Sequence, residues 1–229
     1  MLLLGDRVNE ALDELEKSFK ISDTVLQLRL KAALLEHFNG IYNVKLCTCF
    51  EDILKKDPTC SNSLARLVVM HQRGDYNTEK LAEMIALHLD ATYAKSDTWK
   101  ELASCFLRLL HLGKTGGSVA DGGLIAISAT AFSCRILLLT VLPPNYVTLH
   151  VASSPLAFPF STLAPLIGDL ELLTYKAATA SHLYGREFKF VIKAAEYLEK
   201  ENIMELYSYL HMHIMNSVGF YFNMKRDNS

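Results

Sequence analysis

The sequence predicts an all-α protein of antiparallel helix hairpins stacked as a tetratricopeptide-like array. Apolar residues recur every three to four positions along most of the 229-residue chain, which is the spacing of one helix face. No stretch alternates apolar and polar residues for long enough to favour a strand. Connections of about two to six residues require neighbouring helices to pack antiparallel, since such loops cannot span a helix length.

Six helices are expected in the first half of the chain. Their expected limits are Asp6–Phe19, a second helix capped by Ser22 and Asp23 and stopped at Asn39-Gly40, Asn43–Lys56, Ser61 to Gly74, a fifth beginning at Thr78, and Ser96 to about Leu112. Asp57-Pro58 ends the third helix because a residue before proline avoids the α region. The expected inward-facing side chains include Leu28, Leu35, Phe50, Ile53, Leu54, Leu64, Leu67, His71, Leu81, Ile85, Leu89, Trp99, Leu102 and Phe106. We expect Leu89, Trp99, Leu102 and Phe106 to be buried between the fifth and sixth helices.

The stretch from Phe50 to Tyr76 suggests the repeat type. Asp57-Pro58 follows a helix, and Leu64, Leu67 and Gly74 come after it. This order resembles the tetratricopeptide period of about 34 residues.

Residues 113–167 differ in composition from the rest. From Lys114 to Ile167 only Lys114, Asp121 and Arg135 are charged, and five of the six prolines lie here. We expect a disordered or poorly packed insert that forms no part of the array. The stretch Leu124–Leu142 is long enough to cross a bilayer if helical, but Arg135 and the prolines after it disfavour a membrane span.

Helical order returns after the insert. Asp169 caps a helix that ends at Tyr184-Gly185, and two more helices run over Phe188–Lys200 and from Asn202 to about Val218. The predicted division is therefore an array over 1–112, the insert 113–167, C-terminal helices of the same array over 168–222, and a flexible tail 223–229.

Composition limits the functions open to the chain. The formal net charge is −2, and no long run of Lys or Arg is present, so contact with DNA is expected to be weak or indirect. The five cysteines are an odd number in a chain large enough to fold without disulfides, which favours a reducing compartment.

The motif Gly113-Lys114-Thr115 suggests a nucleotide-binding loop but lacks its context. A phosphate-binding loop needs a glycine five residues before Gly113, where Arg108 stands, and a strand ahead of the loop. We assign no nucleotide site.

Histidines and cysteines offer no metal site in the sequence. His211 and His213 lie two residues apart on a helix and point about 200° apart, so one is expected to face the core and the other the solvent, and His182 completes no set. Cys47 and Cys49 fail as ligands for the same reason and are expected to be small buried residues.

Paired carboxylates occur at Glu14/Glu16, Glu51/Asp52 and Glu199/Glu201, each beside lysine on an expected solvated face. Catalytic carboxylates need burial or a like-charged neighbour in a cleft. The sequence therefore predicts a non-enzymatic protein with no catalytic, cofactor-binding or metal-binding residue and no small-molecule substrate.

Three blocks together resemble a known family. They are Leu4-Gly5-Asp6 with the helix that follows, the stretch Leu81–Leu110, and the stretch Gly168–Asn202. They occur in the order found in the A-type member of the TATA-box-binding-protein-associated factors of RNA polymerase I, in its plant form, and would correspond to the C-terminal part of a longer protein. Residues 113–167 lack the tryptophan-rich, basic segment of that family, as a retained intron or shifted splice would explain.

The resemblance implies a scaffold subunit of the promoter-selectivity complex that acts on ribosomal RNA genes in the nucleolus of the nucleus. It implies the TATA-box-binding protein and other RNA polymerase I factors as partners. The alternative is a peptide-binding adaptor of the co-chaperone type, whose groove needs a clamp of basic side chains. The spacing of Lys55, Lys56, Arg66 and Arg73 builds no evident clamp.

Overall fold

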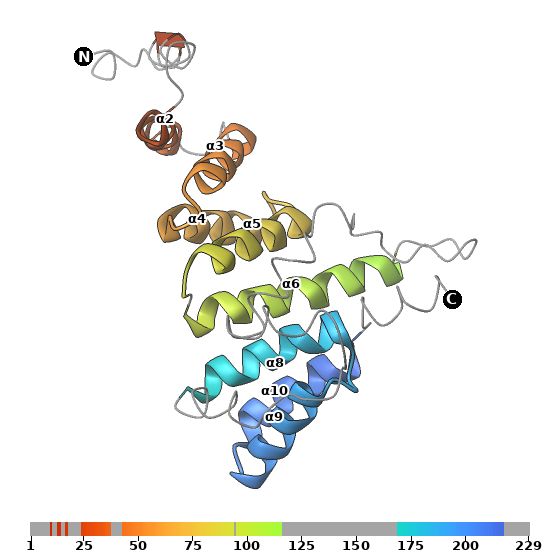
Figure 1. Cartoon of the computed structure of the whole chain (residues 1–229). Coiled ribbons are helices and arrows are strands. Elements are labelled where there is room, and N and C mark those ends of the chain that lie inside the picture. The colour runs from red at the N-terminus through yellow and green to blue at the C-terminus, as the bar shows by residue number, and fades with distance from the viewer. Residues whose placement is uncertain are drawn as a thin grey trace, which may run out of the picture. The chain divides into compact units, whose positions relative to one another are not determined.

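The structure, a computed structural model, describes residues 24–37, 43–93, 95–115 and 169–217, together with Glu10, Asp13, Glu14 and Lys17. All regular elements in these residues are helices (Figure 1), which confirms the all-α class. They are α2 (Val25–His37), α3 (Asn43–Lys56), α4 (Ser61–Gln72), α5 (Thr78–Ala91), α6 (Ser96–Thr115), α8 (Leu170–Tyr184), α9 (Lys189–Lys200) and α10 (Met204–Met215). The chain divides into two units, Met1–Thr92 and Tyr93–Ser229.

The starts of the helices in the first unit differ from expectation by one or two residues. Thr24 forms a reciprocal capping box with Gln27, because the Thr24 amide donates to Gln27 Oε1 and the Gln27 amide donates to Thr24 Oγ1. Asn77, not Thr78, caps α5 by accepting from two backbone amides. Ser61 is the first residue of α4, and Cys60 precedes it without a side-chain capping bond.

The end of α4 follows the sequence prediction. Gly74 has a φ of +86°, and its amide donates to the carbonyl of His71 while the next amide donates to Met70. A left-handed residue here satisfies the last carbonyls of the helix, and glycine adopts that conformation without a Cβ penalty.

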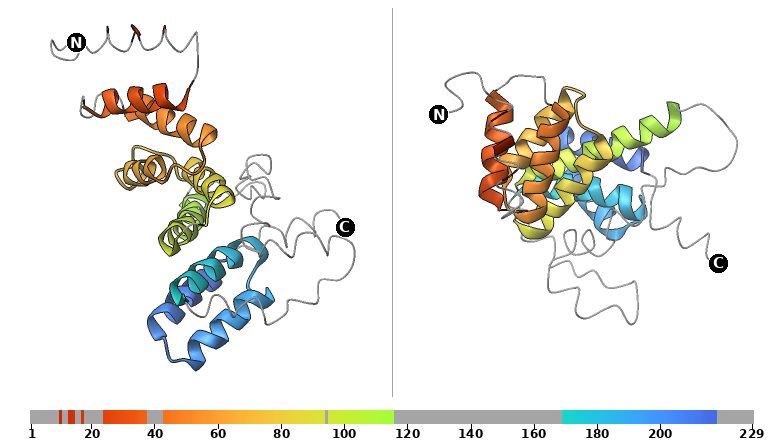
Figure 2. Two further views of the ribbon diagram at one scale, coloured as in Figure 1. Left: turned by 60° about the vertical axis from the view of Figure 1, so that its left-hand side comes forward. Right: turned by 90° about the horizontal axis from the view of Figure 1, so that it is seen from above.

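Helices in the first unit pack on their sequence neighbours and on their second neighbours. Figure 2 shows α2 and α3 side by side in both views. Second neighbours run parallel: Arg29 of α2 meets Asp57, and Glu36 of α2 meets Arg66 of α4, at separations of 28 and 30 residues. The α3–α5 pair repeats this, with contacts Cys47–Asp75, Glu51–Lys80 and Pro58–His88 spaced 28 to 30 residues apart.

The second unit begins with α6, which ends at Thr115, three residues beyond the expected limit. Asp169 caps α8 by accepting from the Leu172 amide, as predicted, and Gly185 follows the helix with a φ of +89°. The last helix is shorter than expected, because Asn202 lies before it in a left-handed turn and Asn216 ends it.

The helices α6 and α8 lie side by side and run in the same direction (Figures 1 and 2). Their contacts keep one register: Ser96 Oγ donates to Glu171 Oε2 at 3.3 Å, Lys176 covers the Trp99 ring, Lys100 covers the Tyr175 ring, and Phe106 stacks on His182. These pairs are 75 to 77 residues apart. The α8–α10 pair is also parallel, but its contacts are 31 and 34 residues apart.

The predicted core is confirmed in its members but not in one of its neighbours. Trp99, Leu102, Phe106 and Leu89 are all buried. The sequence assigned the α6 side chains to a contact with α5, whereas the contacts observed for them are with α8. The alanine-rich surface of α8 allows this close approach, and it lies too far along the chain for short-loop reasoning to find it.

Two expectations fall outside the described residues. They are the packing of residues 116–167 and the apolar face of Asp6–Phe19, of which Glu10, Asp13, Glu14 and Lys17 are helical and exposed. Among the helices that the structure describes, none is long and apolar enough to cross a bilayer.

Candidate functional site

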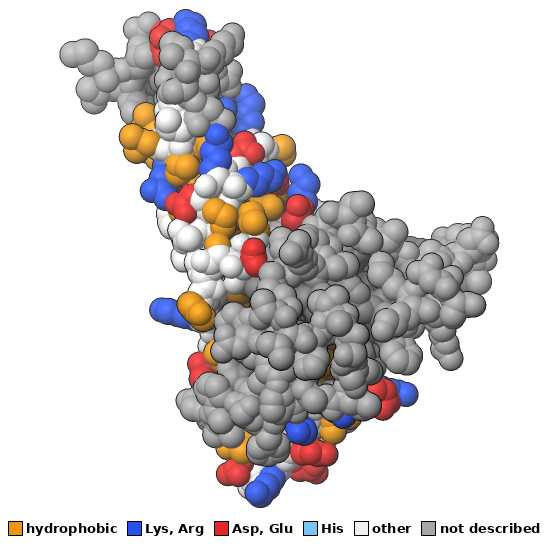
Figure 3. All heavy atoms as spheres, viewed as in Figure 1, with side chains coloured by type: hydrophobic (Ala, Val, Ile, Leu, Met, Phe, Trp, Pro, Cys, Tyr) orange, Lys and Arg blue, Asp and Glu red, His pale blue; other side chains and the backbone are white. Residues whose placement is uncertain are grey.

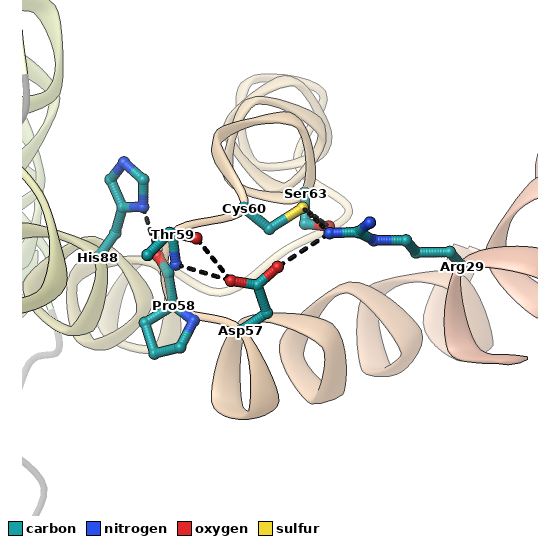
Figure 4. Close-up of polar contacts among 7 residues, drawn as sticks. All are labelled: Arg29, Asp57, Pro58, Thr59, Cys60, Ser63 and His88. Carbon is teal, nitrogen blue, oxygen red and sulfur yellow. Dashed lines mark hydrogen bonds and ion pairs between the residues drawn. The ribbon is translucent and has the colours of Figure 1, made fainter. Parts of the chain in front are cut away.

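A polar cluster lies at the turn between α3 and α4 (Figure 4). Arg29 of α2 donates to Asp57 Oδ2 at 2.9 Å, and Thr59 donates to Asp57 Oδ1 at 2.6 Å. The bond from Thr59, with the charge of Arg29, lowers the pKa of the Asp57 carboxyl. From α5, His88 Nδ1 lies 2.6 Å from the carbonyl of Pro58. The turn therefore connects three helices of the first unit.

Cys60 is the reactive group of this turn. Its Sγ lies 3.3 Å from Ser63 Oγ and 3.7 Å from Arg29 Nη2. Partial burial acts to raise the pKa of the thiol, but the bonds with Ser63 and Arg29 outweigh it and lower the pKa below its usual value. The cysteines named in the sequence behave differently: Cys47 and Cys49 are buried, as predicted, and burial raises the pKa of both thiols.

Two histidines far apart in sequence meet in the second unit. His182 Nε2 of α8 lies 2.9 Å from His213 Nδ1 of α10, and both side chains are fully buried. His211 is exposed, which confirms that only one histidine of the 211/213 pair faces the core. The sequence named His182 without finding its partner, because the contact depends on the parallel register of α8 and α10.

Both buried histidines are neutral near pH 7. Burial, with the neighbouring His213, lowers the pKa of His182 to about 3, and burial lowers the pKa of His213 to about 4. A neutral pair shares one proton between its facing nitrogens. Within the described part of the chain, His182 Nδ1 and His213 Nε2 make no other hydrogen bond.

Aromatic rings enclose the histidine pair on both sides. Phe106 stacks on His182 with ring centroids 5.6 Å apart, and Tyr209 lies 4.5 Å from His213 and 5.1 Å from Tyr175. The described residues contain no group of three potential ligands that could hold a metal ion. The geometry thus describes a buried polar contact in a core, which stabilises the packing of α6, α8 and α10.

The α6–α8 contact adds two reciprocal cation–π pairs. Lys176 lies 5.1 Å from the Trp99 centroid, and Lys100 lies 5.4 Å from the Tyr175 centroid. Burial lowers the pKa of Lys176, while Asp169 acts to raise it. A cation over an aromatic face contributes about 0.5–2 kcal/mol, more where water is excluded.

The remaining sequence candidates lie apart from these clusters. Gly113-Lys114-Thr115 forms the last turn of α6, so its backbone is helical and not a loop after a strand. Glu51 pairs with Lys55 and Lys80, which fits a structural role. Of the four residues considered for a basic clamp, Lys55 and Arg66 are already paired with carboxylates of the chain.

Exposed apolar side chains gather on two helices. Leu26 and Leu30 lie one turn apart on α2 and are 76% and 51% exposed, and three methionines are exposed on α10. Basic and acidic side chains are interspersed over the first unit on the face shown in Figure 3. That face therefore offers no surface of one charge for tracking nucleic-acid phosphates.

The comparisons with known proteins agree with the first two blocks of the resemblance. The model of one family, the A-type TAF of RNA polymerase I, matches residues 1–135, more than half of the chain. The third block, Gly168–Asn202, lies outside the matched range. No curated protein and no solved structure matches the chain. On the extent of the family match, the chain belongs to the family of A-type TAF proteins of RNA polymerase I.

Proposed function

We propose that this chain is a non-catalytic scaffold subunit of the RNA polymerase I pre-initiation complex, acting in the nucleolus on ribosomal RNA genes. The observation that carries the proposal is the family match over residues 1–135. The stacked helices support it, because such arrays expose long surfaces to protein partners and need no cofactor. Parallel second neighbours at 28 to 34 residues support the tetratricopeptide-like arrangement.

The partners are the TATA-box-binding protein and other RNA polymerase I factors. Their contacts with the chain use apolar anchors within a polar rim, as protein interfaces commonly do. With a net charge of −2 the chain contributes little direct affinity for DNA.

Affinity purification from nuclei, with mass spectrometry of the bound proteins, tests this function. We expect the TATA-box-binding protein and RNA polymerase I components to be recovered. Recovery of chaperones without any polymerase I component would instead support the peptide-binding adaptor.

Matched surface variants make the purification more specific. The double variant Leu26→Asp/Leu30→Asp changes exposed side chains within the family-matched range, and Ile192→Asp changes one outside it that is 40% exposed. Loss of polymerase I components with the first variant alone would place the contact within the family segment. Equal recovery with both would exclude the α2 surface.

A further inference from the structure

The last described helix, α10, has an exposed apolar face. Met204, Met212 and Met215 are 52%, 43% and 65% exposed and lie within one side of the helix. We call these three residues the methionine face. Glu205 is the only Asp, Glu, Lys or Arg in α10, so charged side chains do not break this face.

The contrast with α8 shows that α10 has one side uncovered. Ten of the fifteen residues of α8 are buried, whereas only Leu210 and His213 are buried among the twelve of α10. The end of a helical array normally presents a polar outer surface, because an apolar end promotes association. The methionine face departs from that rule.

We propose that the aromatic triplet Phe220–Phe222, which follows α10 in the sequence, folds back onto the methionine face and covers Met212 and Met215. Gly219 precedes the triplet and allows the chain to reverse after a helix end. Thioether groups make favourable contacts with aromatic rings, so methionine and the triplet are chemically matched.

The reach of the chain decides which methionines are covered. Met212 and Met215 lie within about 8 Å of Ser217 along the helix axis, and Met204 lies about 20 Å from it. A chain that turns over Val218 and Gly219 has about 10 Å of extended length left to the end of the triplet. It covers the two nearer methionines and falls short of Met204, which becomes an internal control.

Oxidation of the full chain by dilute hydrogen peroxide, followed by peptide mass spectrometry, tests the proposal. By exposure in the structure, Met215 should oxidise at least as fast as Met204. Covering by the triplet reverses this order, so we expect Met212 and Met215 to oxidise several-fold more slowly than Met204. The double variant Phe220→Ser/Phe222→Ser should raise both to the rate of Met204.

A matched tail variant and a concentration series complete the experiment. Lys225→Ser/Arg226→Ser should leave all three oxidation rates unchanged, and far-UV circular dichroism should show equal helix content in each chain. Rates of Met212 and Met215 that do not respond to the phenylalanine substitutions would overturn the proposal. So would protection that appears only at high protein concentration, because it would identify a second copy as the covering partner.

Discussion

The pairs α3–α5 and α6–α8 have the same geometry and different connections. In each pair two helices run parallel and share a core, but the contacts of the first are separated by 28 to 30 residues and those of the second by 75 to 77. The first pair is joined through α4, and the second through residues 116–168. The comparison shows that matching side chains set the parallel register, since the same packing occurs with a connection more than twice as long.

The two pairs are held by different chemistry. At the α3–α4 turn, Asp57, Thr59 and Arg29 connect three helices through hydrogen bonds and an ion pair at the surface. At the α6–α8 contact, Trp99 and Phe106 are buried against Lys176 and His182. Exposed ion pairs contribute about 0–1 kcal/mol, whereas a buried aromatic contributes several. Disrupting the second region should therefore cost more.

The largest effect should come from shortening the connection between α6 and α8. The chain must return about 30 Å along the twenty residues of α6, because Glu171 lies beside Ser96. This distance requires at least about nine extended residues. Replacing residues 116–168 by a Gly/Ser linker of about twenty residues should preserve cooperative unfolding, and a linker of about four should abolish it.

Thermal unfolding followed by circular dichroism, with the fluorescence of Trp99, measures this effect. Success of the long linker would support the prediction that residues 114–167 take no part in the array. Loss of the buried emission with both linkers would show that this segment contributes to the core.

Substituting Trp99 should give the next largest effect. Trp99, the only tryptophan, is 3% exposed, and Trp99→Ala should lower the free energy of unfolding by about 3–5 kcal/mol. Tyr93→Ala serves as the control, because Tyr93 is fully exposed and its loss should change stability by less than about 0.5 kcal/mol. An emission maximum of the native chain typical of indole in water would contradict the burial.

The buried histidines should make stability fall in acid. Both have a folded pKa below the unfolded value of about 6.5, so the unfolded state binds more protons and stability decreases as the pH falls from about 6.5 toward 4. Each contributes up to about 1.4 kcal/mol per pH unit in that window. Urea unfolding of His213→Gln should show a shallower pH slope than the parent, while His211→Gln should keep the parent slope.

Gly74 provides a test of the regular region. With a φ of +86° and no atom within 4 Å of an added Cβ, Gly74→Ala should act through backbone strain alone. The expected cost is about 1–2 kcal/mol of unfolding free energy, measured by urea titration. A neutral result would mean that the α4–α5 turn changes conformation to accept the side chain.

The smallest expected effect concerns reactivity at the α3–α4 turn. Iodoacetamide near pH 7.5 should modify Cys60 faster than Cys47, Cys49 or Cys105, since burial raises the pKa of the other three. Arg29→Gln should slow the reaction of Cys60 by removing a bond and a charge that lower its pKa. Peptide mass spectrometry resolves each thiol, and equal rates across all four would refute the assignment.

Local signals in the sequence determined the elements and their inner faces. Asp57-Pro58 and Gly74 mark helix ends that the structure shows, and Phe50, Ile53 and Leu54 share the predicted buried face. Such features depend on residues within one or two turns, so a helical period and known capping chemistry are enough to read them. The exact caps were less certain, because Thr24 and Asn77 compete with equally suitable neighbours.

Only the tertiary structure decided which faces meet. Nothing within one helix indicates that Trp99 lies beneath Lys176 or that His182 contacts His213, because those contacts depend on the register of parallel helices joined by long connections. The burial of each side chain follows from its own helix, whereas its partner depends on the shapes of two surfaces together. The sequence therefore determined the class and the core positions, and packing alone determined the buried histidine pair and the α6–α8 contact.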